Sequence, residues 1–371
     1  MSSSSELSSF AARLRGFVLT SARVPAGGLP SFDQLALELF ALQFNHNGPY
    51  RRLCEVRDAL PDTVAHWSGI PAVPTSSFKD FEISCLPVAE RTTVFHSSGT
   101  TGQRPSRHFH NAASLALYEA SLLQWFEAHV PLPMANSQWI MLTPPPAQAP
   151  HSSLVHMLEA IRRQTGSGLS TFVGTVAEDG AWALDLEAAL ESLTAVSASG
   201  QPLLMLGTAF SFVHLLDYLA ERDLRFRLPP GSLAMETGGY KGRSRSLPKE
   251  ALHALISQRL GISPDHIVCE YGMSELSTQA YDCAVGPSRI THHDSRTLRF
   301  PPWARVQIIS PETGREVGEG ETGLIRVFDL ANVYSVMAIQ TEDLGTRRGD
   351  GFTLADRAVL AEPRGCSLMA V

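Results

Sequence analysis

The chain contains, at residues 97–102, the stretch Ser97-Ser98-Gly99-Thr100-Thr101-Gly102. The β-type run Arg91–Phe95 precedes it and predicts a strand, and Asn111 after it can cap a helix. We therefore expect strand, loop and helix in that order. Glycines leave backbone amides free to point at one anion, and the hydroxyls add donors, so the loop predicts a phosphate cradle. A flexible surface turn is the alternative for such a cluster taken alone.

Strands and helices alternate through the middle of the chain. Pro202–Leu206 predicts a buried strand that enters a helix. Ala251–Leu260 carries apolar residues on one helical stripe, Gly261 ends it, and Ile267–Cys269 is the next β run. This alternation predicts a layered α/β fold with a largely parallel sheet.

The two ends of the chain have a different character. Residues 1–10 are rich in serine and predict a frayed end, whereas apolar residues between Leu35 and Leu42 predict helix before residue 75. From Pro301 the pattern changes to short β runs at Val306–Ile309, Gly323–Phe328 and Phe352–Leu354. We therefore expect an α/β core over residues 1–300, a small β-rich subdomain over 301–355 and a flexible tail over 356–371.

Composition excludes several classes of function. The 371 residues carry 37 acidic and 30 basic side chains, a net charge of -7 that gives nucleic acid no broad surface to bind. The longest uncharged run, Ser192–Leu216, is broken by Gly200 and Pro202 and does not predict a membrane span. The 5 cysteines contain no C-x-x-C pair, which argues against disulfides and zinc and favours a reducing cytoplasm.

Further motifs follow the first loop in a fixed order. They are Gly238-Gly239, Tyr271-Gly272-Met273-Ser274-Glu275, Thr341-Glu342-Asp343-Leu344-Gly345, Asp350-Gly351-Phe352 and Asp356-Arg357. Together with residues 96–102 they resemble the signature of the adenylate-forming superfamily, which includes acyl-CoA synthetases, luciferases and the adenylation domains of peptide synthetases. The resemblance implies the large-domain fold of that superfamily and the use of ATP and Mg²⁺.

The resemblance also implies where ATP would bind. The triphosphate would lie on the first loop, held by Ser97, Ser98, Gly99, Thr100, Thr101 and Gly102. Gly238, Gly239 and Tyr271 would flank the adenine, and Gly272 belongs to the same nucleotide-binding set. An aromatic ring offers a face for stacking. The alternative for Tyr271 is a place in the core.

Four other residues complete the implied site. Ser274 would contact the α-phosphate, and Glu275 would hold Mg²⁺, since a carboxylate suits a hard cation. Asp343 would bind the ribose, because it can accept hydrogen bonds from two vicinal hydroxyls, and Arg357 would share that role. A helix N-terminal acid is the alternative for Glu275, and a turn residue is the alternative for Asp343.

The chain also departs from the superfamily pattern. The lysine that normally follows the phosphate loop is missing, and Arg104 or Arg107 can replace its charge. Glu342 and Asp356 stand where the superfamily has glycine. Relatives continue beyond the last arginine with a mobile domain of roughly 100 residues that supplies a catalytic lysine. Here only residues 358–371 follow Arg357.

The last residues of the chain point to one branch of the superfamily. They include Arg364-Gly365-Cys366-Ser367, and a cysteine near the end of a chain without the mobile domain is similar to the LuxE-type acyl-protein synthetases. Ser77-Phe78-Lys79 also resembles that branch. The resemblance implies activation of a fatty acid as an adenylate and its transfer to Cys366 as a thioester. A neighbouring arginine and glycine favour a reactive, movable thiolate, and the other four cysteines lie in apolar contexts that predict burial.

Few cations can assist the phosphate chemistry, because the lysines are Lys79, Lys241 and Lys249. We rank Arg357 first as the catalytic cation and Lys79 and Lys241 after it, since charge builds on the α-phosphate during transfer. Each lysine has a solvated surface position as its alternative. His151 and His214 are candidates for the acyl pocket, with structural histidines as their alternative.

We therefore expect a ligase that activates a carboxylic acid and passes the acyl group on, to a protein such as a reductase or to a carrier thiol. Two other functions stay open. One is a stand-alone adenylating ligase that uses CoA or a carrier protein, with Cys366 incidental. The other is a silent nucleotide-binding subunit of a complex.

Overall fold

A computed structural model of the chain describes residues 3–21, 31–97, 104–130, 137–165, 169–178, 180–238, 247–282 and 296–355. Its centre is a six-stranded sheet in the order β11-β10-β9-β8-β4-β5. The strands are β4 (Gln138–Met141), β5 (Ser170–Phe172), β8 (Leu203–Thr208), β9 (Leu233–Thr237), β10 (Ile267–Tyr271) and β11 (Ala280–Tyr281). Strand β11 pairs antiparallel with β10, and all the other neighbours pair in parallel. The predicted, largely parallel sheet is therefore confirmed.

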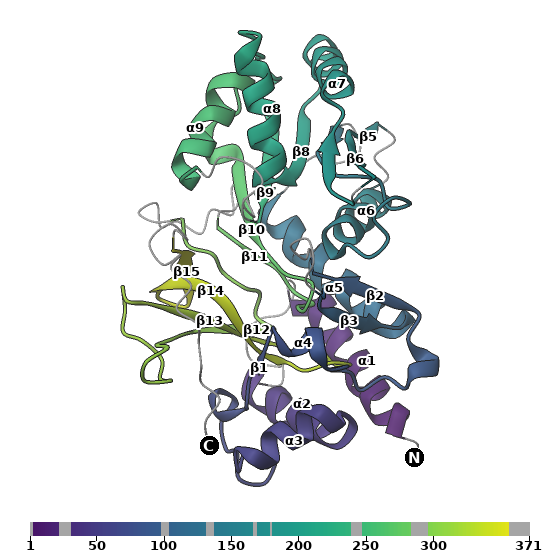
Figure 1. Ribbon diagram of the computed structural model, residues 1–371, viewed down its shortest axis with the longest axis vertical. Coiled ribbons are helices and arrows are strands. Elements are labelled where there is room, and N and C mark those ends of the chain that lie inside the picture. The colour runs from purple at the N-terminus through teal and green to yellow at the C-terminus, as the bar shows by residue number, and fades with distance from the viewer. Residues whose placement is uncertain are drawn as a thin grey trace.

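Helices cover both faces of this sheet (Figure 1). Along β8, Leu203 and Met205 pack into one apolar cluster and Leu204 and Leu206 into another, because successive side chains of a strand point to opposite faces. The first cluster includes α7 (Leu186–Ser199), α8 (Ala209–Glu221) and α9 (Lys249–Leu260), and the second includes α5 (Ala112–His129) and α6 (Ser153–Thr165). The predicted layered α/β fold is therefore confirmed.

A second sheet, of five strands, has the order β1-β14-β13-β12, with β15 beside β14 (Figure 1). Its strands are β1 (Val73–Pro74), β12 (Ala304–Ile309), β13 (Thr322–Asp329), β14 (Ala338–Arg348) and β15 (Gly351–Leu354). Its core includes side chains of α1 (Ser3–Ser21), α2 (Phe32–His46) and α3 (Gly48–Val56). β1 joins by parallel pairing from far upstream. The division at residue 300 stays a prediction.

Two local expectations are wrong. Residues 3–10 are not a frayed end, because α1 begins at Ser3 and buries Leu7 and Phe10. A strand also separates the phosphate loop from its helix, since β2 (Thr93–His96) pairs antiparallel with β3 (Arg107–His110). The loop therefore closes a hairpin and does not lead directly into α5.

The remaining elements are short. They are α4 (Ser77–Asp80), the hairpin of β6 (Gly174–Val176) and β7 (Trp182–Leu184), and 3₁₀ turns at Trp67–Gly69, Val88–Glu90 and Pro264–His266. None of the helices in the described ranges is both long and apolar enough to cross a lipid bilayer.

Candidate active site

A chain of hydrogen bonds joins the phosphate loop to the motif at 271–275. The amide of Ser106 donates to Oγ of Ser97 at 3.0 Å, across the loop that the two residues flank. Oγ of Ser106 lies 3.4 Å from Oγ of Ser274, which donates to Oε2 of Glu275 at 2.9 Å. Residues far apart in the sequence thus meet at one place. Ser98, Gly99, Thr100, Thr101 and Gly102 lie outside the described residues.

Neighbouring groups fix the backbone around Ser274 and Glu275. Nδ1 of His108 lies 2.8 Å from the carbonyl oxygen of Ser274, and Nδ2 of Asn332 donates to the carbonyl of Glu275 at 2.9 Å. Burial lowers the pKa of His108 to about 4, so its ring is neutral at pH 7. The neutral ring adds no positive charge beside the loop.

A second hydrogen bond connects the motifs at 271–275 and 341–345. The hydroxyl of Tyr271 on β10 donates to Oδ2 of Asp343 on β14 at 3.2 Å. Tyr271 is only 6% exposed, and its ring meets that of Phe352 edge-on at 5.3 Å. Burial, followed by the charge of Asp343, raises the pKa of Tyr271, so the phenol keeps its proton. The bond joins the six-stranded sheet to the five-stranded one.

The other predicted residues follow β9 or β10 or lie outside the described ranges. Gly238 follows β9 with φ of +73°, a left-handed conformation that favours glycine. Gly239, Lys241, Arg357 and Cys366 lie outside the described residues. Gly272 continues from β10.

The remaining predicted cations and histidines are spread over the molecule. Lys79 is half-buried on α4, and its neighbour Phe78 packs against His108 with ring centroids 6.3 Å apart. The exposed His151 stacks on His96 at 4.7 Å, beside the strand that enters the phosphate loop. His214 is exposed on α8, where its ring lies 4.4 Å from that of Phe210.

The arginines after the loop differ in their surroundings. Nη1 of Arg107 lies 3.4 Å from Oε1 of Glu82, whereas Arg104 is exposed. Glu82 also accepts from Arg91 at 2.5 Å, and the hydrogen bond from Arg91 holds the pKa of the carboxyl below its usual range. Arg107 is therefore already engaged with a carboxylate.

A pocket that sequence reasoning missed adjoins the motif at 271–275. Nine residues from α5, α6, the ends of β9 and β10 and the segment after β10 line it: Tyr118, Ser153, Leu154, Met157, Thr237, Glu270, Gly272, Met273 and Gln279. Burial raises the pKa of Glu270 to about 7. The signal in the sequence was an acidic residue inside the otherwise apolar run Ile267–Tyr271.

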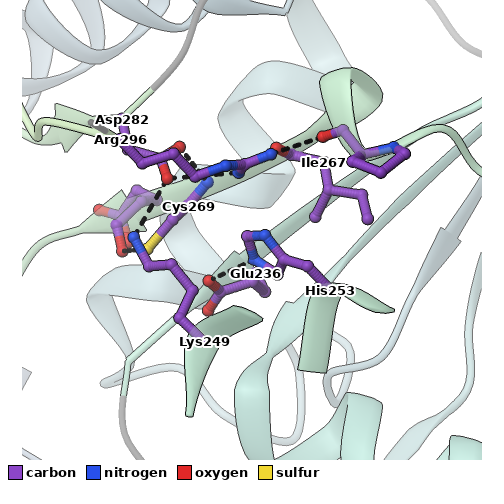
Figure 2. A network of polar contacts seen from close by, with 9 residues as sticks. Glu236, Lys249, His253, Ile267, Cys269, Asp282 and Arg296 are labelled. Atoms are coloured by element: carbon purple, nitrogen blue, oxygen red, sulfur yellow. Dashed lines mark hydrogen bonds and ion pairs between the residues drawn. The ribbon is translucent and has the colours of Figure 1, made fainter. Parts of the chain in front are cut away.

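A network of charged residues lies at the side of β9 and β10 that faces α9 (Figure 2). Nζ of Lys249 lies 3.1 Å from Oδ2 of Asp282, and Nη1 of Arg296 lies 3.4 Å from the same oxygen. His253 faces Glu236 with Nε2 3.2 Å from Oε1. These ion pairs engage Lys249, so it is not available for phosphate chemistry. Among the residues described, no cluster of His, Cys, Asp and Glu has the composition of a metal site.

The family model for LuxE acyl-protein synthetases matches residues 28–370. A long-chain-fatty-acid–luciferin-component ligase of Vibrio harveyi is 23% identical over 358 residues, which cover 91% of this chain and 86% of the relative. The ligase of the same name from Aliivibrio fischeri is also 23% identical, over 84% of this chain and 78% of the relative.

Solved structures with a similar fold are adenylate-forming ligases. A 2-hydroxyisobutyryl-CoA ligase bound to its acyl adenylate and CoA superposes with a TM-score of 0.61 and 15% identity, over 89% of this chain and 68% of that chain. At this identity the likeness concerns the fold alone, and it confirms the expected large-domain fold. From the family match over nearly its whole length, the chain belongs to the LuxE acyl-protein synthetase family and is an acyl-activating ligase.

Proposed function

We propose that this protein activates a carboxylic acid with ATP and then carries the acyl group on Cys366. The hydrogen-bonded chain from Ser97 through Ser106 and Ser274 to Glu275 supports the proposal, because it links the two residues that flank the phosphate loop to those expected at the α-phosphate and the metal. The bond between Tyr271 and Asp343 adds the expected ribose residue.

The reaction has two steps. The substrate carboxylate attacks the α-phosphorus of ATP, pyrophosphate leaves with the electrons of the broken P–O bond, and an acyl adenylate forms. The Cys366 thiolate then attacks the acyl carbonyl, a thioester forms, and AMP leaves. Ser274 would contact the α-phosphate, and Arg357, then Lys79 or Lys241, would balance the charge that develops there.

The residues present fit a magnesium ion. Glu275 is 4% exposed and offers a carboxylate oxygen, the donor that Mg²⁺ prefers, next to the hydroxyl of Ser274. Glu275 would therefore hold the ion. When bound, Mg²⁺ neutralises phosphate charge during the transfer.

Chemistry favours Cys366 over the described cysteines. Cys54 and Cys269 are buried, as expected, whereas Cys85 is half-buried. Burial raises the pKa of Cys54 to about 11 and that of Cys85 to about 12, and it also raises that of Cys269. Such thiols form little thiolate at pH 7. Cys283, like Cys366, lies outside the described residues.

A thioester suits onward transfer, so we expect an acyl-accepting partner. The relatives' names point to a luciferin component as theirs, and a reductase or a carrier thiol is the class we propose here. We place the protein in the cytoplasm, where its cysteines would stay reduced.

Acid-dependent exchange of labelled pyrophosphate into ATP tests the first step. The chain alone should catalyse exchange with at least one acid of a panel that varies in length and polarity. Glu275→Ala should abolish it by removing the metal ligand, whereas Glu312→Ala, at an exposed turn, should keep it. No exchange with any acid at saturating ATP and Mg²⁺ would contradict adenylation and favour a silent nucleotide-binding subunit. Full activity of Glu275→Ala would contradict the metal assignment.

A further inference from the structure

The pocket beside the 271–275 motif has the position of an acyl site. Thr237 and Glu270 stand at the ends of neighbouring parallel strands, and their Cα atoms are partners in the register of β9 and β10. Ligands of parallel α/β sheets bind at the carboxyl ends of the strands. Gly272 and Met273 belong both to the pocket lining and to the motif at 271–275. An acid bound here would lie next to the residues proposed for the α-phosphate.

Buried hydrogen-bond acceptors dominate the polar part of the pocket. Glu270 is 3% exposed, and the hydroxyl of Thr237 donates to its Oε2. Gln279 is 4% exposed and donates from Nε2 to the hydroxyl of Tyr118 at 3.4 Å. Oε1 of Gln279 is buried and accepts no hydrogen bond from any residue that the structure describes.

Two hydroxyl donors of the same pocket are already in use. The hydroxyl of Tyr118 donates to the carbonyl of Ser153 at 3.4 Å, and that of Thr237 is engaged with Glu270. Two buried acceptors, the Glu270 carboxyl and the Gln279 amide oxygen, thus belong to residues that line a pocket whose Tyr118 and Thr237 hydroxyls are already engaged. A buried acceptor that lacks a donor costs free energy. A ligand that supplies donors would recover that cost.

The rest of the lining is apolar and close. Leu154, Met157 and Met273 offer side chains that suit a short aliphatic segment. A Cβ at Gly272 would lie 2.4 Å from Oε1 of Glu270, so the glycine gives this carboxyl its room. A plain alkyl chain in this pocket would bury the Glu270 carboxyl against carbon, which is unfavourable.

We propose that Glu270 and Gln279 select the acid, and that the substrate is a carboxylic acid whose chain carries a hydroxyl or an amino group. The proposal rests on the adenylating function above and specifies its substrate class. A donor on the chain would bond to both acceptors, while the aliphatic carbons pack against Leu154 and Met157. A site built to bond a substrate hydroxyl or amine discriminates strongly against the analogue that lacks it.

Pyrophosphate exchange with matched acids tests the proposal. The panel pairs butanoic, hexanoic and octanoic acids with their 3-hydroxy and 3-amino counterparts, and the readout is the ratio of kcat/KM within each set. We expect the wild type to favour a donor-bearing acid by at least about tenfold. Glu270→Leu should reduce that ratio by about tenfold or more, and Gln279→Leu is a second variant with the same expected direction. Glu312→Gln, at an exposed turn, should leave the ratio unchanged.

Glu270→Gln identifies the donor. It keeps an acceptor but removes the charge, so it should preserve a preference for the hydroxy acid and lose one for the amino acid. A wild type that prefers the plain acids, or variants that lower all three classes equally, would overturn the proposal.

Failure of adenylation is separable from failure of this proposal. If no acid supports exchange, calorimetric binding of the same acids without nucleotide decides the pocket's role. Tighter binding of the donor-bearing acids that Glu270→Leu abolishes would support selection by Glu270. Equal binding of all three classes would overturn it.

Discussion

Buried carboxyl groups lie close to the candidate active site. Because burial disfavours the ionised form, each group makes the stability of the fold depend on pH. Burial raises the pKa of Glu270 to about 7 and that of Asp329 to about 6. Asp329 accepts backbone hydrogen bonds from Ser277 at 2.7 Å and from Ala331 at 3.0 Å, which hold the chain after β10 and favour its ionised form. Glu270 accepts a hydrogen bond from the hydroxyl of Thr237, which only partly offsets the effect of burial on its carboxyl.

Glu270 should make the protein less stable as pH rises. Its carboxyl is protonated in the folded state up to about pH 7 but in the unfolded chain only to about pH 4.5, so the folded state holds more protons between these values. The free energy of unfolding should therefore fall from pH 4.5 to pH 7 because of this group. In Glu270→Gln that contribution disappears, and the variant should gain stability relative to the wild type as pH rises.

Urea unfolding of the wild type and of Glu270→Gln at pH 5, 6, 7 and 8 measures the difference in their free energies of unfolding. A difference between the two that stays constant across this range would contradict the raised pKa of Glu270.

Asp343 should contribute to ATP affinity through its charged oxygen atoms. Asp343→Ala removes an acceptor proposed for two ribose hydroxyls, and we expect a loss on the order of 2 kcal/mol in binding, which is more than tenfold in Kd. Calorimetric titration with ATP checks it. Glu312→Ala, at an exposed turn outside the motifs, is the control and should change little. Equal affinities for ATP in a folded Asp343→Ala and the wild type would refute the ribose assignment.

At the scale of elements, sequence patterns predicted helices and strands with a strong apolar periodicity. They missed strands that form only because distant segments pair with them. Helix α9 ends at Leu260, and the φ of +72° at Gly261 matches the predicted helix stop. Strand β14 was missed because Glu342, Asp343, Arg347 and Arg348 interrupt any apolar alternation. It is a strand because β13 and β1 supply hydrogen bonds on its two sides. A local sequence pattern cannot predict that Ile339 pairs with a residue as distant in the sequence as Val73.

Gly351, a glycine of one of the motifs, allows the backbone of a neighbouring segment to approach closely. A Cβ there would lie 2.3 Å from the backbone oxygen of Leu298, which pairs with Phe352 through two backbone hydrogen bonds. Gly351→Ala should therefore destabilise the protein by roughly 1–3 kcal/mol, because backbone must move. Gly16→Ala on α1, where no atom lies within 4 Å, should instead stabilise by up to about 1 kcal/mol. Urea unfolding compares the two, and an unchanged Gly351→Ala midpoint would show that β15 tolerates the added methyl.

At the scale of the whole molecule, the site joins parts that are remote in sequence. Tyr271 belongs to the six-stranded sheet and Asp343 to the five-stranded one, so their hydrogen bond brings two motifs together across the two sheets. The order of the motifs in the sequence was enough to propose both residues for the nucleotide site. The Glu270 pocket could not be predicted, since it exists only where α5, α6, β9 and β10 pack together.

The covalent state of Cys366 tests the central claim most directly. Incubation with ATP, Mg²⁺ and an acid that supports exchange should add one acyl mass to the intact protein, and neutral hydroxylamine should remove it, because this nucleophile cleaves thioesters but not amides. Cys366→Ser should lose the adduct while pyrophosphate exchange continues, since the thiol acts only after the adenylate has formed. An adduct of wild-type amount in Cys366→Ser, or one that maps to Cys54, Cys85, Cys269 or Cys283, would contradict the account and favour an enzyme that passes its adenylate to CoA or a carrier protein.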